Sequence, residues 1–488
     1  MKNKLLIMLI VILAQSLFAI SFEKNVLSSE KSKVLIGSNV YPDSLHKITG
    51  DNYFSLQSLN NVKSYLKESL GKNQSINFIN FRDPKHNFNF RGNILGGFDY
   101  VSGKKDSSYY YVYKGFRFYG NYQKNLTFYA NWWAGHISGN KDYALNNTEL
   151  LNGFYKYTPS VDSNIYVDRI QGFLKYHTKI ANLELGRGKF NIGENIGGSV
   201  ILSNNTNDYG YFSTTFNYKN WRLSLLHCEL IADSVDTNYY YKTYENKFLA
   251  LHMLEWQNET NHIFAGEEIV YGNRSPEINY FLPHIFWRNL EHNLNDRDNV
   301  MIFLGGEKIL FSNAKIYFNF NLDELRKSEI FSNWWGNKYA FQSGLKYFLN
   351  EKEENSLTFQ FTAVRPWVYT HKDLIDKFSN DGVGLGFTDG SNLIQYSFLF
   401  KQKIFSGRFR LFSKYTRQGS LGNDFSINYE SRPKNTANWL EGKITDTFHI
   451  DSSYLFHIKK HHSLKIGIKY EHSNNDLIEE FLSYSFCL

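Results

Sequence analysis

His371 and Asp373 are the side chains whose types and spacing come nearest to a reactive pair in this sequence. An imidazole beside a carboxylate can act as a general base, and His284 with Glu291 offers a second such combination. Nothing marks a nucleophile next to either pair, and the chain contains no Gly-x-Ser-x-Gly motif. We therefore predict no catalytic residues and no enzymatic activity.

Patterns for binding a metal or a phosphate are equally weak. His461 and His462 are adjacent, so in a strand they point to opposite faces and make a poor pair of ligands. The glycine-rich stretch around Gly384 and Gly386 lacks the following Lys-Ser or Lys-Thr of a phosphate-binding loop and is typical of a flexible loop. We predict no metal site and no cofactor.

Paired carboxylates occur at Asp323 and Glu324, and again at Glu267 and Glu268, near the ends of predicted strands. Such pairs are usually solvated strand ends or members of ion pairs that face a polar lumen. The alternative is that acids and bases inside a barrel hold loops together, which would narrow or close its pore.

Several aromatic residues stand beside polar ones in a way that suits sugars. The C–H face of a sugar stacks on an aromatic ring, while Asp, Asn and Arg bind its hydroxyl groups. Trp335, Trp367 and Tyr369 could serve in this way. The alternative for each is a place in the aromatic girdle of a membrane barrel.

Period-two alternation of apolar and polar residues dominates the chain from about residue 87 onward. It is clearest in five segments, 116–122, 316–322, 357–363, 394–400 and 464–470. This alternation places one set of side chains on each face of a strand. A soluble β-sandwich shows the same alternation, so further features must decide between the two.

Three features favour strands that span a membrane. The alternating segments are about ten residues long, which is the length that a tilted strand needs to cross the hydrocarbon. Aromatic residues gather near the segment ends, at 109–111, 132–133, 239–241 and 334–335. The chain finishes in an alternating, aromatic-rich strand, 482–488, of the kind that the barrel-assembly machinery reads in outer-membrane proteins.

Backbone groups that face lipid cannot remain unpaired, so such strands must close into a barrel. Between residues 87 and 488 there is room for roughly sixteen to twenty strands. We predict an all-β fold, a large antiparallel transmembrane β-barrel that contacts outer-membrane lipid.

The region before residue 87 differs from the rest. Residues 1–19 have a charged start, a short apolar run and small residues at the end, which predicts a cleaved secretory signal peptide. Leu59, Val62 and Leu66 recur at helical spacing, and Gly71 follows. We predict that 20–86 is a short periplasmic segment with an amphipathic helix, which docks on the barrel or caps its lumen.

The chain carries a formal net charge of +7, without a dense run of Lys or Arg, so we predict no nucleic-acid partner. This small excess of positive charge is compatible with binding of an anionic polymer. The two cysteines, Cys228 and Cys487, are far apart in sequence, and either a disulfide or two unpaired thiols would suit an envelope protein.

Long polar stretches predict extracellular loops at 141–148, 233–246, 288–298, 371–392 and 418–439. Short ones predict periplasmic turns, for example at 121–124 and 405–407.

Four ordered stretches resemble the Wzi-type capsule-assembly outer-membrane proteins. They are Leu185-Gly186-Arg187 through Gly193-Glu194 to Leu202-Ser203, the stretch 268–283, the stretch 298–324 that ends in Asp323-Glu324, and the stretch 365–387 with its Tyr369-Thr370-His371. Ile192 stands where this family commonly has Trp, and Phe387 where it commonly has His.

The resemblance implies a barrel of about 18 strands, closed by its own loops, with a periplasmic helical piece. It also implies a lectin-like role in attaching or assembling capsular or other surface polysaccharide at the Gram-negative outer membrane. The residues it implies for binding or for the motifs are Arg187, Asp323, Glu324, Trp367, Tyr369, His371 and Asp373. The alternative function, indicated by the polar lumen face alone, is a porin or solute channel.

Overall fold

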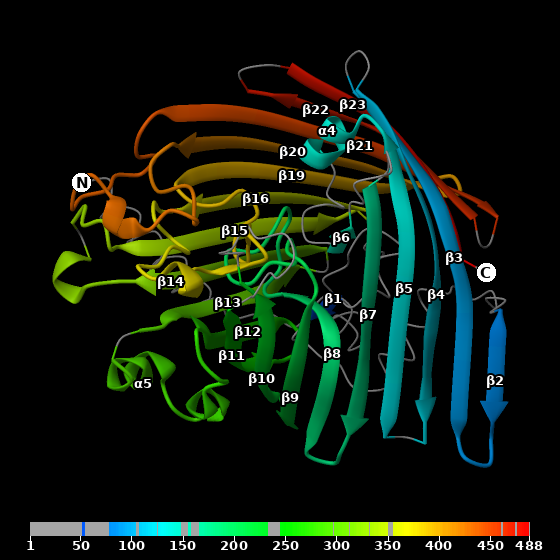
Figure 1. The fold of residues 1–488 in the computed structure, drawn as a ribbon, viewed down its shortest axis with the longest axis horizontal. Helices are drawn as coiled ribbons and strands as arrows, with labels where there is room; N and C mark the ends of the chain where they lie inside the picture. Colours follow the sequence, from blue (N-terminus) through cyan, green and yellow to red (C-terminus); the bar gives the residue numbers. More distant parts are fainter. Residues whose placement is uncertain are drawn as a thin grey trace.

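The computed structural model describes residues 51–53, 78–103, 107–123, 125–147, 155–157, 165–232, 245–295, 297–311, 313–330, 332–349, 355–459, 462–473 and 476–487. The predicted signal peptide and amphipathic helix lie outside these residues. Within them, 18 antiparallel strands form one closed barrel (Figure 1), as predicted.

The barrel strands follow one another around the wall in chain order. They are β3 (Phe88–Ser102), β4 (Ser108–Tyr122), β5 (Leu126–Gly139), β7 (Ile165–His177), β8 (Ala181–Asn191), β9 (Tyr209–Tyr218), β10 (Trp221–Ile231), β11 (Asn246–Gln257), β12 (Asn261–Gly272), β13 (Asn299–Phe311), β14 (Ala314–Glu324), β15 (Lys338–Phe348), β16 (Ser356–Val364), β19 (Leu393–Ile404), β20 (Gly407–Gly419), β21 (Ile444–Lys459), β22 (His462–His472) and β23 (Asp476–Cys487).

The last strand closes the barrel against the first. β23 pairs with β3 from Glu480 opposite Ser102 to Cys487 opposite Leu95. The short β2 (Ile79–Asp83) pairs with the start of β3 and forms a hairpin with it. The aromatic-rich final strand that the sequence predicts is therefore the strand that removes the free edge.

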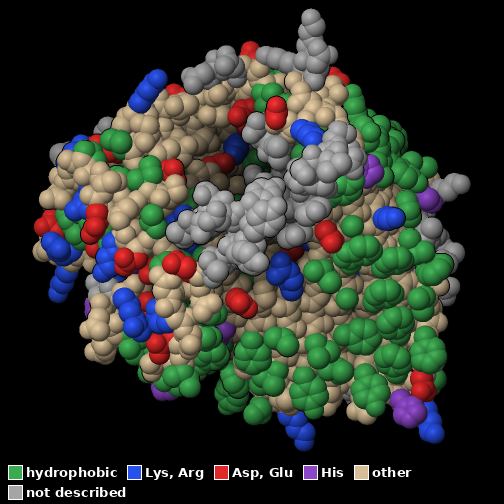
Figure 2. Space-filling model, in the orientation of Figure 1, with side chains coloured by type: hydrophobic (Ala, Val, Ile, Leu, Met, Phe, Trp, Pro, Cys, Tyr) green, Lys and Arg blue, Asp and Glu red, His purple; other side chains and the backbone are tan. Residues whose placement is uncertain are grey.

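Each strand has one apolar and one polar face. On β22, Ile466 and Ile468 are exposed on the outside, whereas Lys465 and Lys469, which flank them, lie over the ring of Phe481 on the inside. Figure 2 shows apolar side chains gathered over the lower part of the outer wall formed by the early strands. Apolar exposure on this scale belongs to a surface that meets lipid.

Long and short connections alternate, so the two ends of the barrel differ. The short ones include 123–125, 178–180, 219–220, 258–260, 312–313 and 405–406. The long ones are 140–164, 192–208, 232–245, 273–298, 325–337, 365–392 and 420–443. The described residues of the predicted loops fall on the long-connection end, and those of both predicted turns on the other, where β3 begins and β23 ends. Most of the predicted loop 233–246 lies outside the described residues.

Short elements lie within or beside these connections. They are β1 (Asp51–Tyr53), which runs parallel to the end of β8, β6 (Tyr155–Tyr157), which pairs with β7, α4 (Lys141–Asn147), η2 (Ile278–Phe281), α5 (Trp287–Asn293), η3 (Lys327–Glu329), η4 (Leu374–Asp376), the β17 (Ser379–Asn380) and β18 (Val383–Gly384) pair, and η5 (Tyr429–Ser431). No helix among the described residues is both long and apolar enough to cross a bilayer.

The connection 273–298 folds back over the outside of the wall, where α5 lies beside β11 to β13 (Figure 1). Trp287 is fully buried there and stacks on His252 of β11, with 4.1 Å between ring centroids. The carboxylate of Glu267 accepts the backbone N–H groups of Trp287 and Arg288. Glu267 thus satisfies the free N–H groups that every helix start leaves unpaired.

The apolar outer face generates the first prediction. Phe359 on β16 is 56% exposed and packs against Phe398 of β19, near the middle of that strand, whereas Phe405 is 93% exposed in a turn. Phe359→Arg places a charge in hydrocarbon, so we expect the free energy of unfolding to fall. The decrease should be about 2–4 kcal/mol if residue 359 lies near the bilayer midplane, and smaller if it lies closer to an interface. Phe405→Arg is the matched control and should change stability little. Denaturant unfolding in lipid vesicles measures both, and equal effects would contradict an apolar belt at β16.

Candidate functional site

The connection 192–208 turns inward and is fastened to the inner wall. Gln360 on β16 makes two hydrogen bonds to the backbone of Ile196, accepting its N–H and donating to its carbonyl, both at 2.8 Å. Asn321 on β14 donates to the carbonyl of Val200 at 3.0 Å. Buried backbone groups need such partners, so wall amides replace water around this loop.

Buried charges fasten the same loop nearer the short-turn end of the lumen. Glu194 accepts hydrogen bonds from Lys315 on β14 at 2.8 Å and from Lys346 on β15 at 3.3 Å. Lys315, fully buried, also reaches Glu307 on β13 at 3.0 Å. Acidic and basic side chains therefore hold a loop inside the barrel. This arrangement corresponds to the alternative given above for charged residues in the lumen, in which they bind loops and narrow the pore.

The connection 365–392 forms the second inner loop. Asp323, at the end of β14, accepts the backbone N–H of Tyr369 at 2.8 Å and the ammonium group of Lys338 at 2.6 Å. Lys338 also lies 3.5 Å from Glu324, whose side chain is 31% exposed. The Tyr369 hydroxyl donates to the carbonyl of Val200 at 2.7 Å and so joins the two inner loops. Three predicted site residues, Asp323, Glu324 and Tyr369, thus come together.

Trp367 belongs to an aromatic cluster among the long connections. It is 5% exposed and is buried with Trp335, while Arg432 lies over the Trp335 ring at 3.8 Å. Trp367 and Tyr369 both have positive φ, 68° and 72°, a region that costs energy for such bulky residues. Their burial compensates that strain, so these rings lock the loop rather than present an open face.

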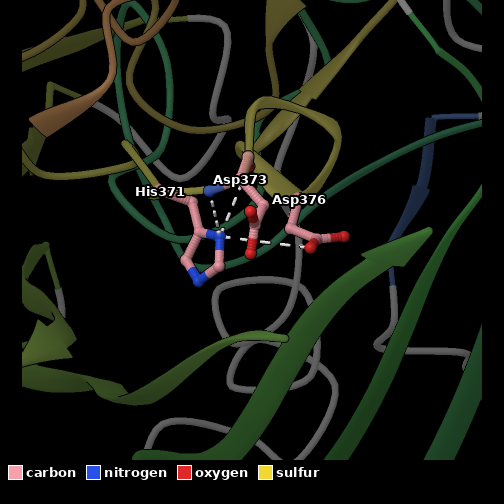
Figure 3. Close-up of side chains that lie close together, drawn as sticks. All are labelled: His371, Asp373 and Asp376. Carbon is pink, nitrogen blue, oxygen red and sulfur yellow. Dashed lines mark hydrogen bonds and ion pairs between the residues drawn. The ribbon is translucent and has the colours of Figure 1, made fainter. Parts of the chain in front are cut away.

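His371, Asp373 and Asp376 follow in the same loop (Figure 3). His371 is 8% and Asp376 5% exposed, whereas Asp373 is exposed. The N–H of Asp373 donates to His371 Nδ1 at 3.1 Å, and Asp376 Oδ2 lies 4.0 Å from that nitrogen. Burial and the nearby acids Asp298 and Asp373 raise the pKa of Asp376 to about 7.

Asp376 was not among the predicted residues. The pattern His371-x-Asp373-x-x-Asp376 was visible in the sequence. The pattern gains its meaning from the η4 turn, which brings Asp376 back toward the imidazole. No pattern of residues in the sequence predicts that turn.

Arg187 lies apart from the other predicted residues. It is exposed on β8, on the outward side that it shares with Leu183 and Leu185. The inward side of that strand carries Glu184, which accepts from the Tyr211 hydroxyl at 2.6 Å. Alternation along β8 therefore turns Arg187 away from the loops that hold the remaining predicted residues.

The other candidates from the sequence have local roles. Glu291 is fully buried and pairs with Arg288 at 3.0 Å, whereas His284 is exposed. Glu268, which follows the cap-forming Glu267 on β12, points to the opposite face and accepts from Asn321 at 3.0 Å. Both cysteines are free thiols.

The inner wall is not filled evenly. Inward side chains on β14 to β16, such as Asn319, Gln342 and Gln360, are buried beneath the two loops. On β20 and β22, inward residues such as Arg410 and Lys469 remain half exposed. Polar side chains there line a part of the lumen that the described loops do not occupy.

Comparison with known proteins gives the fold. No family model matches the chain, and no curated protein matches it. Among solved structures, Wzi of Escherichia coli, described as a carbohydrate-binding β-barrel involved in group 1 capsule assembly, aligns with a TM-score of 0.52 at 9% identity over 81% of this chain and 84% of Wzi. The chain has the fold of an outer-membrane β-barrel.

Two porins from the same comparison have lower TM-scores. OprD of Pseudomonas aeruginosa gives a TM-score of 0.46 at 10% identity, over 82% of this chain and 95% of OprD. OccAB2 of Acinetobacter baumannii gives a TM-score of 0.47 at 9% identity, over 82% of this chain and 98% of OccAB2. At these identities the likeness concerns architecture alone.

The Asp323–Lys338 pair generates the second prediction, because both side chains are at most 3% exposed. Lys338→Met leaves a buried carboxylate without its cation, so we expect the free energy of unfolding to fall by about 3–5 kcal/mol. Adding Asp323→Asn should restore much of it, since the amide still accepts the Tyr369 N–H. Arg417→Met, which breaks the exposed pair with Asp446, is the control and should cost about 0–1 kcal/mol. A double variant no better than Lys338→Met would contradict this account.

Proposed function

We propose that this protein is a non-catalytic outer-membrane barrel that holds surface polysaccharide at its long-connection end. The observation that carries the proposal is the inner plug, defined here as the connections 192–208 and 365–392. Its two loops bond to each other as well as to the wall, since Ser203 donates its N–H to the carbonyl of Leu385 at 2.7 Å. A barrel whose lumen is occupied in this way suits surface binding better than passage of solutes.

The packing around the plug supports a permanent rather than a movable obstruction. Val200, Leu202, Val368 and Leu385 from the plug are fully buried in one apolar cluster with wall residues of β10 to β16. Moving either loop would expose this apolar surface and break its hydrogen bonds to the wall. We infer that the plug stays in place while polymer binds outside.

Apart from Arg187 on the outer side of β8, the predicted site residues divide into two groups by exposure. Asp323, Trp367, Tyr369 and His371 are buried and position the loop. Glu324 and Asp373 remain accessible and are the ones to offer oxygen atoms to sugar hydroxyl groups. The likeness to Wzi, a carbohydrate-binding β-barrel, supports the same class of ligand.

The third prediction concerns polysaccharide attachment. Deleting the gene should shift surface polysaccharide from the cell-bound to the shed fraction, measured by staining both fractions. Complementation with Glu324→Gln plus Asp373→Asn should restore attachment only in part, whereas Asp446→Asn, an exposed acid at the same end, should restore it fully. Unchanged attachment in the deletion strain would overturn the proposal.

A solute channel is the second candidate function, and the half-exposed inner residues of β20 and β22 favour it. The fourth prediction separates the two functions by planar-bilayer conductance. A plugged barrel should give no steady current, and deletion of residues 193–203 should produce one, because the wall would lose the loop that covers it. Large steady currents from the unaltered protein would favour the channel.

A further inference from the structure

Three potential metal ligands converge at the long-connection end. One donor atom each from His371, Asp373 and Asp376 lies within 4.8 Å of the other two. All three residues lie in the connection 365–392, and the η4 turn brings the third back to the first (Figure 3). The sequence alone predicted no metal site, because His371 and Asp373 were considered without Asp376.

Asp376 is independently unusual. It is 5% exposed, and its Oδ1 is buried with no hydrogen-bond partner among the described residues. Its other oxygen faces His371 Nδ1 at 4.0 Å, which is beyond hydrogen-bonding distance. Burying a carboxylate without a partner is costly, so such an oxygen indicates a missing positive charge.

The charges around Asp376 add to that need. Asp298 on the neighbouring wall is buried, and it is already paired with Arg274 at 2.5 Å. Lys247 donates to the Ser379 hydroxyl at 3.0 Å. Arg274 and Lys247 both favour the charged form of Asp376, but they donate hydrogen bonds to Asp298 and Ser379, while the carboxylates of Asp373 and Asp376 face the imidazole together (Figure 3).

We propose that His371, Asp373 and Asp376 bind a divalent cation of the Zn²⁺ class. Zn²⁺ takes imidazole nitrogen and carboxylate oxygen ligands at about 2.0–2.2 Å in a tetrahedral arrangement, in which two donor atoms lie about 3.4 Å apart. The separation of 4.0 Å between His371 Nδ1 and Asp376 Oδ2, and of at most 4.8 Å within the group, would therefore shorten when the ion binds. Ca²⁺ and Mg²⁺ prefer six or more oxygen ligands and are less suited to this set.

His371 Nδ1 lies 3.1 Å from the Asp373 backbone nitrogen and 3.3 Å from the Asp373 carbonyl oxygen. With the ring proton on Nε2, Nδ1 offers its lone pair to an ion, whereas a proton on Nδ1 would have to leave or move to Nε2 before the ion binds. Three protein ligands leave an open position toward solvent, on the side of the exposed Asp373, for water or for an oxygen of a ligand.

Binding would also fasten the loop to the wall. Asn299 at the start of β13 donates to the carbonyl of Asp376 at 3.0 Å, so the ion would extend a link from the wall to His371. This consequence holds whichever of the two proposed functions is correct.

The test is calorimetric titration of ZnCl₂, CaCl₂ and MgCl₂ into the untagged full chain in detergent after treatment with a chelator. We expect one Zn²⁺ site, weakened at least tenfold by His371→Ala and by Asp376→Asn. We also expect Zn²⁺ to raise the thermal unfolding midpoint of the unaltered protein, and not that of the His371→Ala or Asp376→Asn variant. His472→Ala is the matched control, because His472 forms an exposed pair with Asp476 at 2.6 Å at the same end, and the described residues supply no third ligand there. Zn²⁺ should bind this variant and raise its unfolding midpoint as it does for the unaltered protein.

Heat-modifiable migration on gels verifies that each variant is folded, and Asp373→Asn, at an exposed position, gives a third variant that leaves the buried side chains in place. Equal Zn²⁺ affinity in these variants and the unaltered protein, or no saturable binding at all, would overturn the proposal. Tighter binding of Ca²⁺ or Mg²⁺ than of Zn²⁺ would overturn the choice of ion.

Discussion

Satisfaction of backbone hydrogen bonds in lipid is the constraint on which this structure depends. No water is available to an unpaired N–H or C=O in hydrocarbon, so the sheet must close, and β23 pairs with β3. Closure divides every strand into an outer face selected for lipid and an inner face free to be polar. The inner amides and charges of β13 to β16 exist because of that division, and they hold the plug.

The inside of the barrel follows ordinary rules for protein interiors once it is filled. Gln360 pairs with the backbone of Ile196, and Asp323 pairs with Lys338 and with the Tyr369 N–H. A polar wall would otherwise need water as its partner, and the loops supply backbone groups instead. The plug is thus the means by which the inner wall of β14 to β16 is satisfied, and it carries Trp367, Tyr369, His371 and Asp373 at the long-connection end.

Much of the site was predictable and part of it was not. Asp323, Glu324, Tyr369 and His371 were expected as motif residues, and the structure places them in one region. Arg187 lies on the outer side of β8 instead, because a single step in strand parity reverses the direction of a side chain. The inward loop 192–208 was not expected as a long connection, since its apolar residues look like strand residues until a lumen exists to bury them.

The sequence by itself determined the class of fold. Alternation, strand length and aromatic strand ends depend only on neighbouring residues, so they predict strands and a closed barrel without knowledge of contacts. Only the tertiary structure decided which loops turn inward and which carboxylates lack a partner. Gly193 illustrates the reason. It has a φ of 80°, and the side chain of Asn319 occupies the place where a Cβ would lie, although the two residues are more than a hundred positions apart in the chain. Such contacts arise from closure of the barrel, so the pattern of neighbouring residues does not predict them.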